Sequence, residues 1–155
     1  MQVTKIVAKL LKQNITIGSV ESFTGGLFAA RLVDVPGVSK VFKGAIVAYQ
    51  NEVKTKLVGV NESDLEKYGA VSSIVAQQMA RNGKAKLGVD FCFAFTGNAD
   101  TNNGIVEGGN VYIALAYGDD EIIEHIHITG DRTKVRNDAV TYAFAILERV
   151  LENYN

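Results

Sequence analysis

Apolar residues recur along this chain at a helical spacing in some segments and at a strand spacing in others. Near the start, an apolar residue returns at positions i, i+3 and i+4, which predicts a helix whose buried stripe is formed by Val3, Ile6, Val7, Leu10 and Leu11. Residues that commonly cap helices precede further helical segments. We expect these helices at residues 27–33, at 52–57 after Asn51, after the capping-box pattern of Ser63 and Glu66, after Ser72, and after Asp131.

Short runs of β-branched and aromatic residues predict five strands between these helices. The strands are expected at residues 15–20, 44–49, 90–96, 111–117 and 121–129, the last two joined by a hairpin. The run from Phe91 to Phe95 is apolar on both faces, which is typical of a central strand covered by helices. Helices that alternate with strands predict an α/β fold, a three-layer α/β/α sandwich around a mixed, mostly parallel sheet, formed by one domain over residues 1–155.

Composition excludes several classes of function. With 16 Lys and Arg against 17 Asp and Glu, the chain lacks the broad basic face that nucleic-acid binding needs. Cys92 is the only cysteine, which excludes an intramolecular disulfide and a multi-thiolate zinc site. No segment approaches the roughly 20 apolar residues of a membrane span, and Lys5 and Lys9 interrupt the pattern that a signal peptide would need. We therefore expect a cytoplasmic protein with no nucleic-acid or membrane partner.

The turn after the first predicted strand contains two hydroxyl groups and two glycines, in the order Ser22, Thr24, Gly25 and Gly26. Free N–H groups and the positive end of the helix dipole favour negative charge at such a strand-to-helix turn. The turn could bind a phosphate, or it could stabilise the oxyanion that forms when a hydroxyl attacks a carbonyl. Ordinary capping by Thr24 is the alternative interpretation, and local sequence alone favours it.

A serine nucleophile also needs a base, because its hydroxyl is almost fully protonated at neutral pH. His125 and His127 share the polar face of one predicted strand, so we expect them to face solvent. A lysine with a lowered pKa can serve instead. Tyr49, at a strand end, and Lys54, in the next helix, can both point into a cleft at the sheet edge, although a half-buried tyrosine and a solvated lysine are the simpler outcome.

At these residues the chain resembles the CinA C-terminal domain family of nicotinamide mononucleotide deamidases. The resemblance rests on several short motifs in the same order along nearly the whole chain. They are Glu21-Ser22, Thr24-Gly25-Gly26, Pro36-Gly37 with Ser39, Phe42 and Gly44, the run from Tyr49 to Lys54, Leu57 to Val60, Gly69 to Ser72, Thr96-Gly97, and Gly130-Asp131-Arg132.

The resemblance implies hydrolysis of the carboxamide of nicotinamide mononucleotide, a small-molecule nucleotide, by a serine amidohydrolase that needs no metal or other cofactor and is often a homo-oligomer. It implies that Ser22 is the nucleophile, Lys54 its activating base and Tyr49 an assisting hydroxyl. The residues implied to line the substrate pocket are Thr24, Gly25, Gly26, Thr96 and Gly97. Arg132 could bind a phosphate bidentately, or could be ordinary surface charge.

The chain departs from the family pattern at Phe23, where a cysteine is common, at Gln50, where a serine is common, and above all in one loop. After Gly97 it reads Asn98-Ala99-Asp100-Thr101, where the family usually has Ile-Ala-Gly-Pro, and Val106 to Gly109 replace Lys-Pro-Val-Gly. The loop thereby gains Asp100 and Glu107, and acidic side chains near a phosphate weaken its binding. The altered loop favours one alternative, a relative that acts on a different small amide. Two others stay open, which are a non-catalytic module that binds a nucleotide or phosphate at the helix start and a plain oligomeric scaffold, although a scaffold would leave the Ser22, Tyr49 and Lys54 set unexplained.

Overall fold

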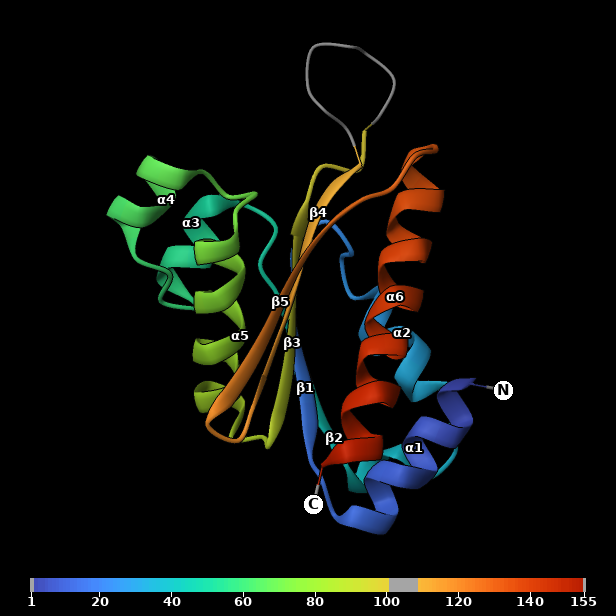
Figure 1. Cartoon of the computed structure of the whole chain (residues 1–155). Helices are drawn as coiled ribbons and strands as arrows, with labels where there is room; N and C mark the ends of the chain where they lie inside the picture. The colour runs from blue at the N-terminus through green and yellow to red at the C-terminus, as the bar shows by residue number, and fades with distance from the viewer. Residues whose placement is uncertain (1, 101–108, 155) are drawn as a thin grey trace.

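The computed structural model describes residues 2–100 and 109–154 (Figure 1). Helices and strands alternate through most of the chain, and the last two strands form a hairpin before the final helix. In chain order the elements are α1 (Gln2–Gln13), β1 (Ile17–Glu21), α2 (Leu27–Val33), the 3-10 helix η1 (Val38–Lys40), β2 (Phe42–Val47), α3 (Asn51–Lys56), α4 (Glu62–Tyr68), α5 (Ser73–Leu87), β3 (Phe91–Gly97), β4 (Asn110–Tyr117), β5 (Asp120–His127) and α6 (Arg132–Asn153).

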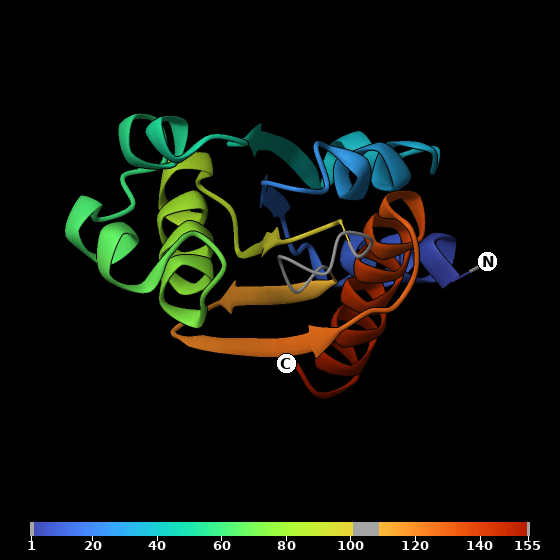
Figure 2. The ribbon, with the colours of Figure 1, turned by 90° about the horizontal axis from the view of Figure 1, so that it is seen from above.

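The five strands form one mixed sheet in the order β2-β1-β3-β4-β5. Strand β1 pairs in parallel with both β2 and β3, whereas β4 runs antiparallel to β3 and β5. Helices α3, α4 and α5 cover one face of the sheet, and α1, α2 and α6 cover the other (Figures 1 and 2). The predicted three-layer α/β/α sandwich is confirmed. In the described residues, no helix combines the length and apolar character that a bilayer crossing needs.

Strand β3 joins the two apolar cores, as its unbroken apolar sequence predicts. Phe91, Phe93 and Phe95 point into the core beneath α1, α2 and α6, while Cys92 and Ala94 point into the core beneath α5. The Phe28 ring of α2 stacks on Phe144 of α6 with 4.8 Å between ring centroids. Aromatic contacts therefore fix α2, and with it the turn that precedes α2, against the sheet and α6.

The predicted caps of α3 and α4 are wrong, and local hydrogen bonds explain the difference at α4. Helix α4 begins two residues early, because the Asn61 side chain accepts the N–H of Asp64 and the Ser63 hydroxyl also donates to it. Helix α3 starts at Asn51 itself and has no side-chain cap. The Ser72 cap of α5 and the Asp131 cap of α6 are confirmed, since each side chain accepts an N–H from the first turn.

The three parallel strands end side by side. Glu21, the last residue of β1, lies in register with Val47 of β2 and Phe95 of β3. The chain segments that leave these strands therefore emerge at one edge of the sheet. The connection after β1 runs through α2 on one face, and the connection after β2 runs through α3 to α5 on the other. In α/β proteins, this change of direction is where ligands usually bind.

Candidate active site

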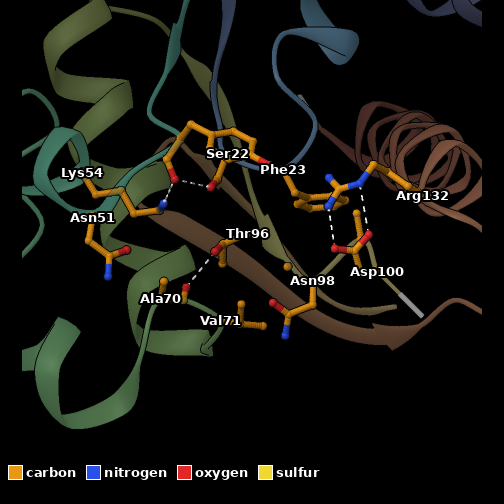
Figure 3. A pocket seen from close by; sticks show the side chains of 13 residues that line it. Ser22, Phe23, Asn51, Lys54, Ala70, Val71, Thr96, Asn98, Asp100 and Arg132 are labelled. Carbon is orange, nitrogen blue, oxygen red and sulfur yellow. Dashed lines mark hydrogen bonds and ion pairs between the residues drawn. The ribbon is translucent and has the colours of Figure 1, made fainter. Parts of the chain in front are cut away.

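A cavity of about 320 Å³ opens at this edge of the sheet. The ends of β1 and β3, the segment after β2, and the start of α6 all contribute to its wall (Figure 3). Six of the residues singled out in the sequence line it, namely Ser22, Tyr49, Lys54, Thr96, Gly97 and Arg132. The structure thus brings together residues that are up to 110 positions apart in the chain.

Ser22 is the first residue after β1 and is held there by the neighbouring strand. Its N–H donates to the Phe95 carbonyl at 3.0 Å, and its own carbonyl accepts the Gly25 N–H at 3.0 Å, which closes a tight turn. The side chain is nearly buried, with 7% of its surface exposed, and its hydroxyl donates to the Tyr49 carbonyl at 3.4 Å. The Ser22 hydroxyl is therefore fixed at the cavity wall.

Lys54 reaches the same carbonyl from α3. It is 1% exposed, and its Nζ donates to the Tyr49 carbonyl oxygen at 2.8 Å (Figure 3). Burial lowers the pKa of Lys54 from 10.5 to about 8, because desolvation penalises the charged ammonium. The serine hydroxyl and the lysine amine thus converge on one acceptor, and the lysine loses its proton far more readily than a lysine in water.

Tyr49 contributes its backbone to this pair. Its carbonyl accepts from both Ser22 and Lys54, whereas the side chain is 57% exposed. The Tyr49 hydroxyl instead interacts with the Arg132 side chain, where it helps to raise the pKa of the guanidinium. An assisting role for this hydroxyl in proton transfer stays a prediction.

Glu21 has a structural role that the sequence analysis missed. Its fully buried carboxylate accepts the N–H groups of Gly26, Phe28 and Ala29 at 3.0–3.1 Å, and also the Ser19 hydroxyl at 3.0 Å. These three N–H groups are those of the start of α2. The predicted anion site at this helix start is therefore wrong for these donors, because the protein's own carboxylate occupies them.

The predicted pocket residues Thr24, Gly25 and Gly26 are not among the residues that line the cavity. They form the turn that supports Ser22 and Phe23, and Gly26, with φ of 99°, takes the N-cap position of α2 in place of Thr24. Thr24 is fully buried, and in the described part of the chain its hydroxyl has no hydrogen-bond partner. In the same described residues, the N–H groups of Phe23 and Thr24 have no acceptor. Of the two, the Phe23 N–H is the candidate for binding an oxyanion, because Phe23 lines the cavity whereas Thr24 is fully buried and does not.

An ion pair lies at the mouth of the cavity. The Arg132 guanidinium donates from Nε to Asp100 Oδ1 at 3.1 Å and from its terminal nitrogen to Oδ2 at 2.8 Å (Figure 3). Asp100 is the main cause of the raised pKa of Arg132. The bidentate face of Arg132 is thus already occupied by a carboxylate from the altered loop. Thr101 and Glu107, other altered positions of that loop, lie outside the described residues.

The remaining reactive side chains lie away from this cavity. Cys92 is buried, and burial raises the pKa of its thiol to about 12, so it remains an unreactive thiol. His125 and His127 are exposed on β5, as their strand spacing predicts. Among residues 2–100 and 109–154, no three His, Cys, Asp or Glu side chains converge in a way that could hold a metal ion.

Replacing Glu21 tests its role at the start of α2. Glu21→Ala leaves three buried N–H groups and one hydroxyl without their acceptor, so we expect the free energy of unfolding to fall by about 3 kcal/mol. Glu21→Gln keeps one acceptor oxygen and should cost about half as much. Urea denaturation measures both, with Glu62→Ala, an exposed acid in the first turn of α4, as the control. A Glu21→Ala variant within about 0.5 kcal/mol of the control would contradict this role.

Comparison with known proteins agrees with the fold and identifies the family. Residues 2–151 match the CinA C-terminal domain. The chain is 44% identical over 147 residues to a putative competence-damage inducible protein of Acetivibrio thermocellus and 43% identical over 150 residues to a CinA-like protein of Dictyoglomus turgidum. These alignments cover 93% and 96% of this chain, but the chain spans only 36% of the length of either relative.

Solved structures of the same superfamily have the same architecture. The CinA superfamily protein of Escherichia coli superposes with a TM-score of 0.91 at 26% identity, covering 96% of this chain and 88% of that chain. The corresponding protein of Klebsiella pneumoniae superposes with a TM-score of 0.93 at 24% identity, covering 99% and 97%. With the family match extending over nearly all of its length, the chain belongs to the CinA C-terminal domain family.

Proposed function

We propose that this domain is a serine amidohydrolase that converts nicotinamide mononucleotide to nicotinic acid mononucleotide and ammonia. The observation that supports catalysis most strongly is the convergence of the Ser22 hydroxyl and the buried Lys54 amine on the Tyr49 carbonyl, at the wall of a cavity. Serine–lysine pairs are a known way to activate a nucleophile. The choice of nicotinamide mononucleotide rests on the resemblance of the motifs to the deamidases of this family.

The first half of the reaction forms an acyl-enzyme. Neutral Lys54 accepts the Ser22 proton as the oxygen attacks the carboxamide carbon, and the carbonyl electron pair moves onto its oxygen. The N–H group of Phe23, which lines the cavity, binds this oxyanion. When the intermediate collapses, the carbon–nitrogen bond breaks, and protonated Lys54 gives its proton to the leaving nitrogen. Ammonia departs, and the acid remains as an ester on Ser22.

The second half of the reaction restores the enzyme. Neutral Lys54 accepts a proton from a water molecule as that water attacks the ester carbon, and the Phe23 N–H binds the second oxyanion. Collapse then breaks the bond to the Ser22 oxygen, which recovers the proton from Lys54. The net reaction consumes one water and releases the carboxylic acid and ammonia.

The lowered pKa of Lys54 makes this cycle practicable. A lysine with pKa 10.5 is neutral in only about one molecule in 3,000 at pH 7, whereas a pKa of about 8 leaves about one in ten neutral. The protonated form is also a better acid toward the leaving nitrogen than an ordinary ammonium. Because the neutral amine is the base, the rate should rise as the pH increases through about 8.

Ammonia release from nicotinamide mononucleotide tests the proposal directly. We expect Ser22→Ala and Lys54→Met each to lower kcat by at least about 10³-fold, because each removes one member of a unit that acts together. Lys56→Met is the matched control, since Lys56 lies on the same helix with an exposed side chain, and it should stay within twofold of wild type.

Thermal unfolding of each variant separates lost chemistry from lost structure. A folded Ser22→Ala variant that keeps more than a tenth of the wild-type rate would rule out Ser22 as the nucleophile. Nicotinamide and glutamine serve as control substrates.

One observation favours a second candidate, an amidohydrolase for a related amide without a phosphate. A phosphate that binds Arg132 must displace Asp100, which already forms both hydrogen bonds of the bidentate pair. The other cation among the described cavity residues is Lys54, which the mechanism needs in its neutral form. Residues 101–108 contain neither lysine nor arginine. The charge balance at the mouth is therefore less suited to a phosphate than the motifs alone suggest.

Replacing Asp100 distinguishes the two candidates. If the substrate phosphate uses Arg132, Asp100→Asn should raise kcat/KM for nicotinamide mononucleotide by about 3- to 5-fold, which corresponds to the free energy of one solvent-exposed ion pair. The same variant should leave nicotinamide riboside, which lacks the phosphate, within twofold. Asp119→Asn makes the same change of charge in the exposed β4–β5 turn and is the control. A wild-type enzyme that prefers the riboside would establish the second candidate instead.

A further inference from the structure

The side-chain amide of Asn98 lines the cavity and is left over by the contacts described above. Ser22, Lys54, Thr96 and Arg132, which also line it, each donate a hydrogen bond to another group of the wall. The half-buried Asn98 side chain, by contrast, has no hydrogen-bond partner in the described part of the chain. An amide of this kind has both a donor and an acceptor to offer a ligand.

The backbone of Asn98 is held by the sheet. Its N–H donates to the Asn110 carbonyl at 3.0 Å, and its own carbonyl accepts the Gly109 N–H at 2.6 Å. These two hydrogen bonds continue the pairing of β3 with β4 by one residue beyond Gly97. The amide therefore projects from the end of a paired strand, and the sheet sets its position relative to Ser22.

The end of β3 leads from the candidate nucleophile toward the mouth of the cavity. Thr96 lies beside Ser22, because the parallel register of β1 and β3 continues by one residue past its last pair. Asn98 is two residues further, which is about 7 Å along an extended strand. Asp100 follows at the mouth, where it pairs with Arg132 (Figure 3). Asn98 thus faces the middle of the cavity, between the reacting end and the ion pair.

A second amide in the cavity wall lies at the reacting end instead. The Asn51 side chain also has no hydrogen-bond partner among the described residues. It lies beside Lys54, on the side of Ser22 that is opposite to Arg132 (Figure 3). Asn98 is therefore the amide placed to contact the part of a substrate that extends from the reacting carbon toward the mouth.

The parts of a nicotinamide nucleoside or nucleotide follow a fixed order, from the carboxamide through the pyridine ring to the ribose, with any phosphate last. When the carboxamide carbon lies at the Ser22 oxygen and the molecule extends toward the mouth, its ribose lies opposite Asn98. The 2′ and 3′ hydroxyls of ribose each donate and accept, and the amide supplies one acceptor oxygen and one NH₂ donor. The isoleucine that the family usually has at this position could form neither hydrogen bond.

We propose that Asn98 binds the ribose hydroxyls of the substrate and makes this site specific for nicotinamides that carry a ribose. The inference rests on the proposed amidohydrolase function and deepens it. It applies equally to the nucleotide and to the riboside, because both contain the two hydroxyls. Asn98 takes no part in bond breaking, so its contribution is to substrate binding.

Kinetics of Asn98→Leu and Asn98→Ile, made in the full chain, test the inference with two apolar side chains of different shape. We expect each to lower kcat/KM for ammonia release from nicotinamide mononucleotide by about 10-fold, mainly through KM. 1-Methylnicotinamide, which carries a methyl group in place of the ribose, should change by less than twofold. Asn153→Leu makes the same change at an exposed residue near the end of α6 and should leave both substrates unaffected. Equal losses for the two substrates, or no loss for the nucleotide, would overturn the inference.

A binding measurement separates this inference from the proposed reaction. Titration calorimetry of nicotinamide riboside into Ser22→Ala measures affinity without turnover, and adding Asn98→Leu to that variant should raise Kd about 10-fold. If Kd depends on Asn98 in this way while the wild-type protein releases no ammonia, the proposed reaction fails and the role of Asn98 stands. Ammonia release by the wild type together with an unchanged Kd would leave the reaction intact and refute that role. Failure of the riboside to bind Ser22→Ala would refute it as well.

Discussion

The Tyr49 carbonyl oxygen is the contact on which the candidate site depends. It accepts hydrogen bonds from both the Ser22 hydroxyl and the Lys54 amine, so one backbone atom sets the position of two side chains from different elements. A buried amine is costly unless it is hydrogen-bonded, and this acceptor gives Lys54 a partner without the charge of a carboxylate. A carboxylate there would stabilise the ammonium and raise its pKa. A neutral acceptor lets burial lower the pKa instead.

The rest of the fold keeps this contact in place. The parallel register of β1, β2 and β3 brings Ser22, Tyr49 and Thr96 to one sheet edge, and the Thr96 hydroxyl donates to the Ala70 carbonyl in the loop before α5. On the other side of Ser22, the Glu21 carboxylate occupies the first N–H groups of α2. The protein's own carboxylate therefore supplies the negative charge that the start of α2 favours. Any N–H group that binds a ligand beside Ser22 must come from the turn between β1 and α2.

The fold was largely predictable, because apolar periodicity, turn residues and the Ser72 and Asp131 caps act over a few positions of sequence. The strand-end argument predicted only that Tyr49 and Lys54 could point into one cleft, whereas the pairing of Ser22 with Lys54 and the roles of the two residues came from the family resemblance. What the sequence analysis missed depends on contacts across the chain or on the backbone. Glu21 reaches N–H groups five to eight residues ahead, beyond any local capping pattern, and Tyr49 contributes its carbonyl, which no residue type reveals.

The claim that burial leaves Lys54 easily deprotonated beside Ser22 can be measured at that one amine. Proton NMR of the protein with ¹³C-labelled lysine side chains follows each lysine through a pH titration, and the resonance missing from Lys54→Met assigns this residue. The account predicts a midpoint at about 8 for Lys54, with ammonia release rising over the same pH range. A midpoint near 10.5, the value of an exposed lysine, would contradict it.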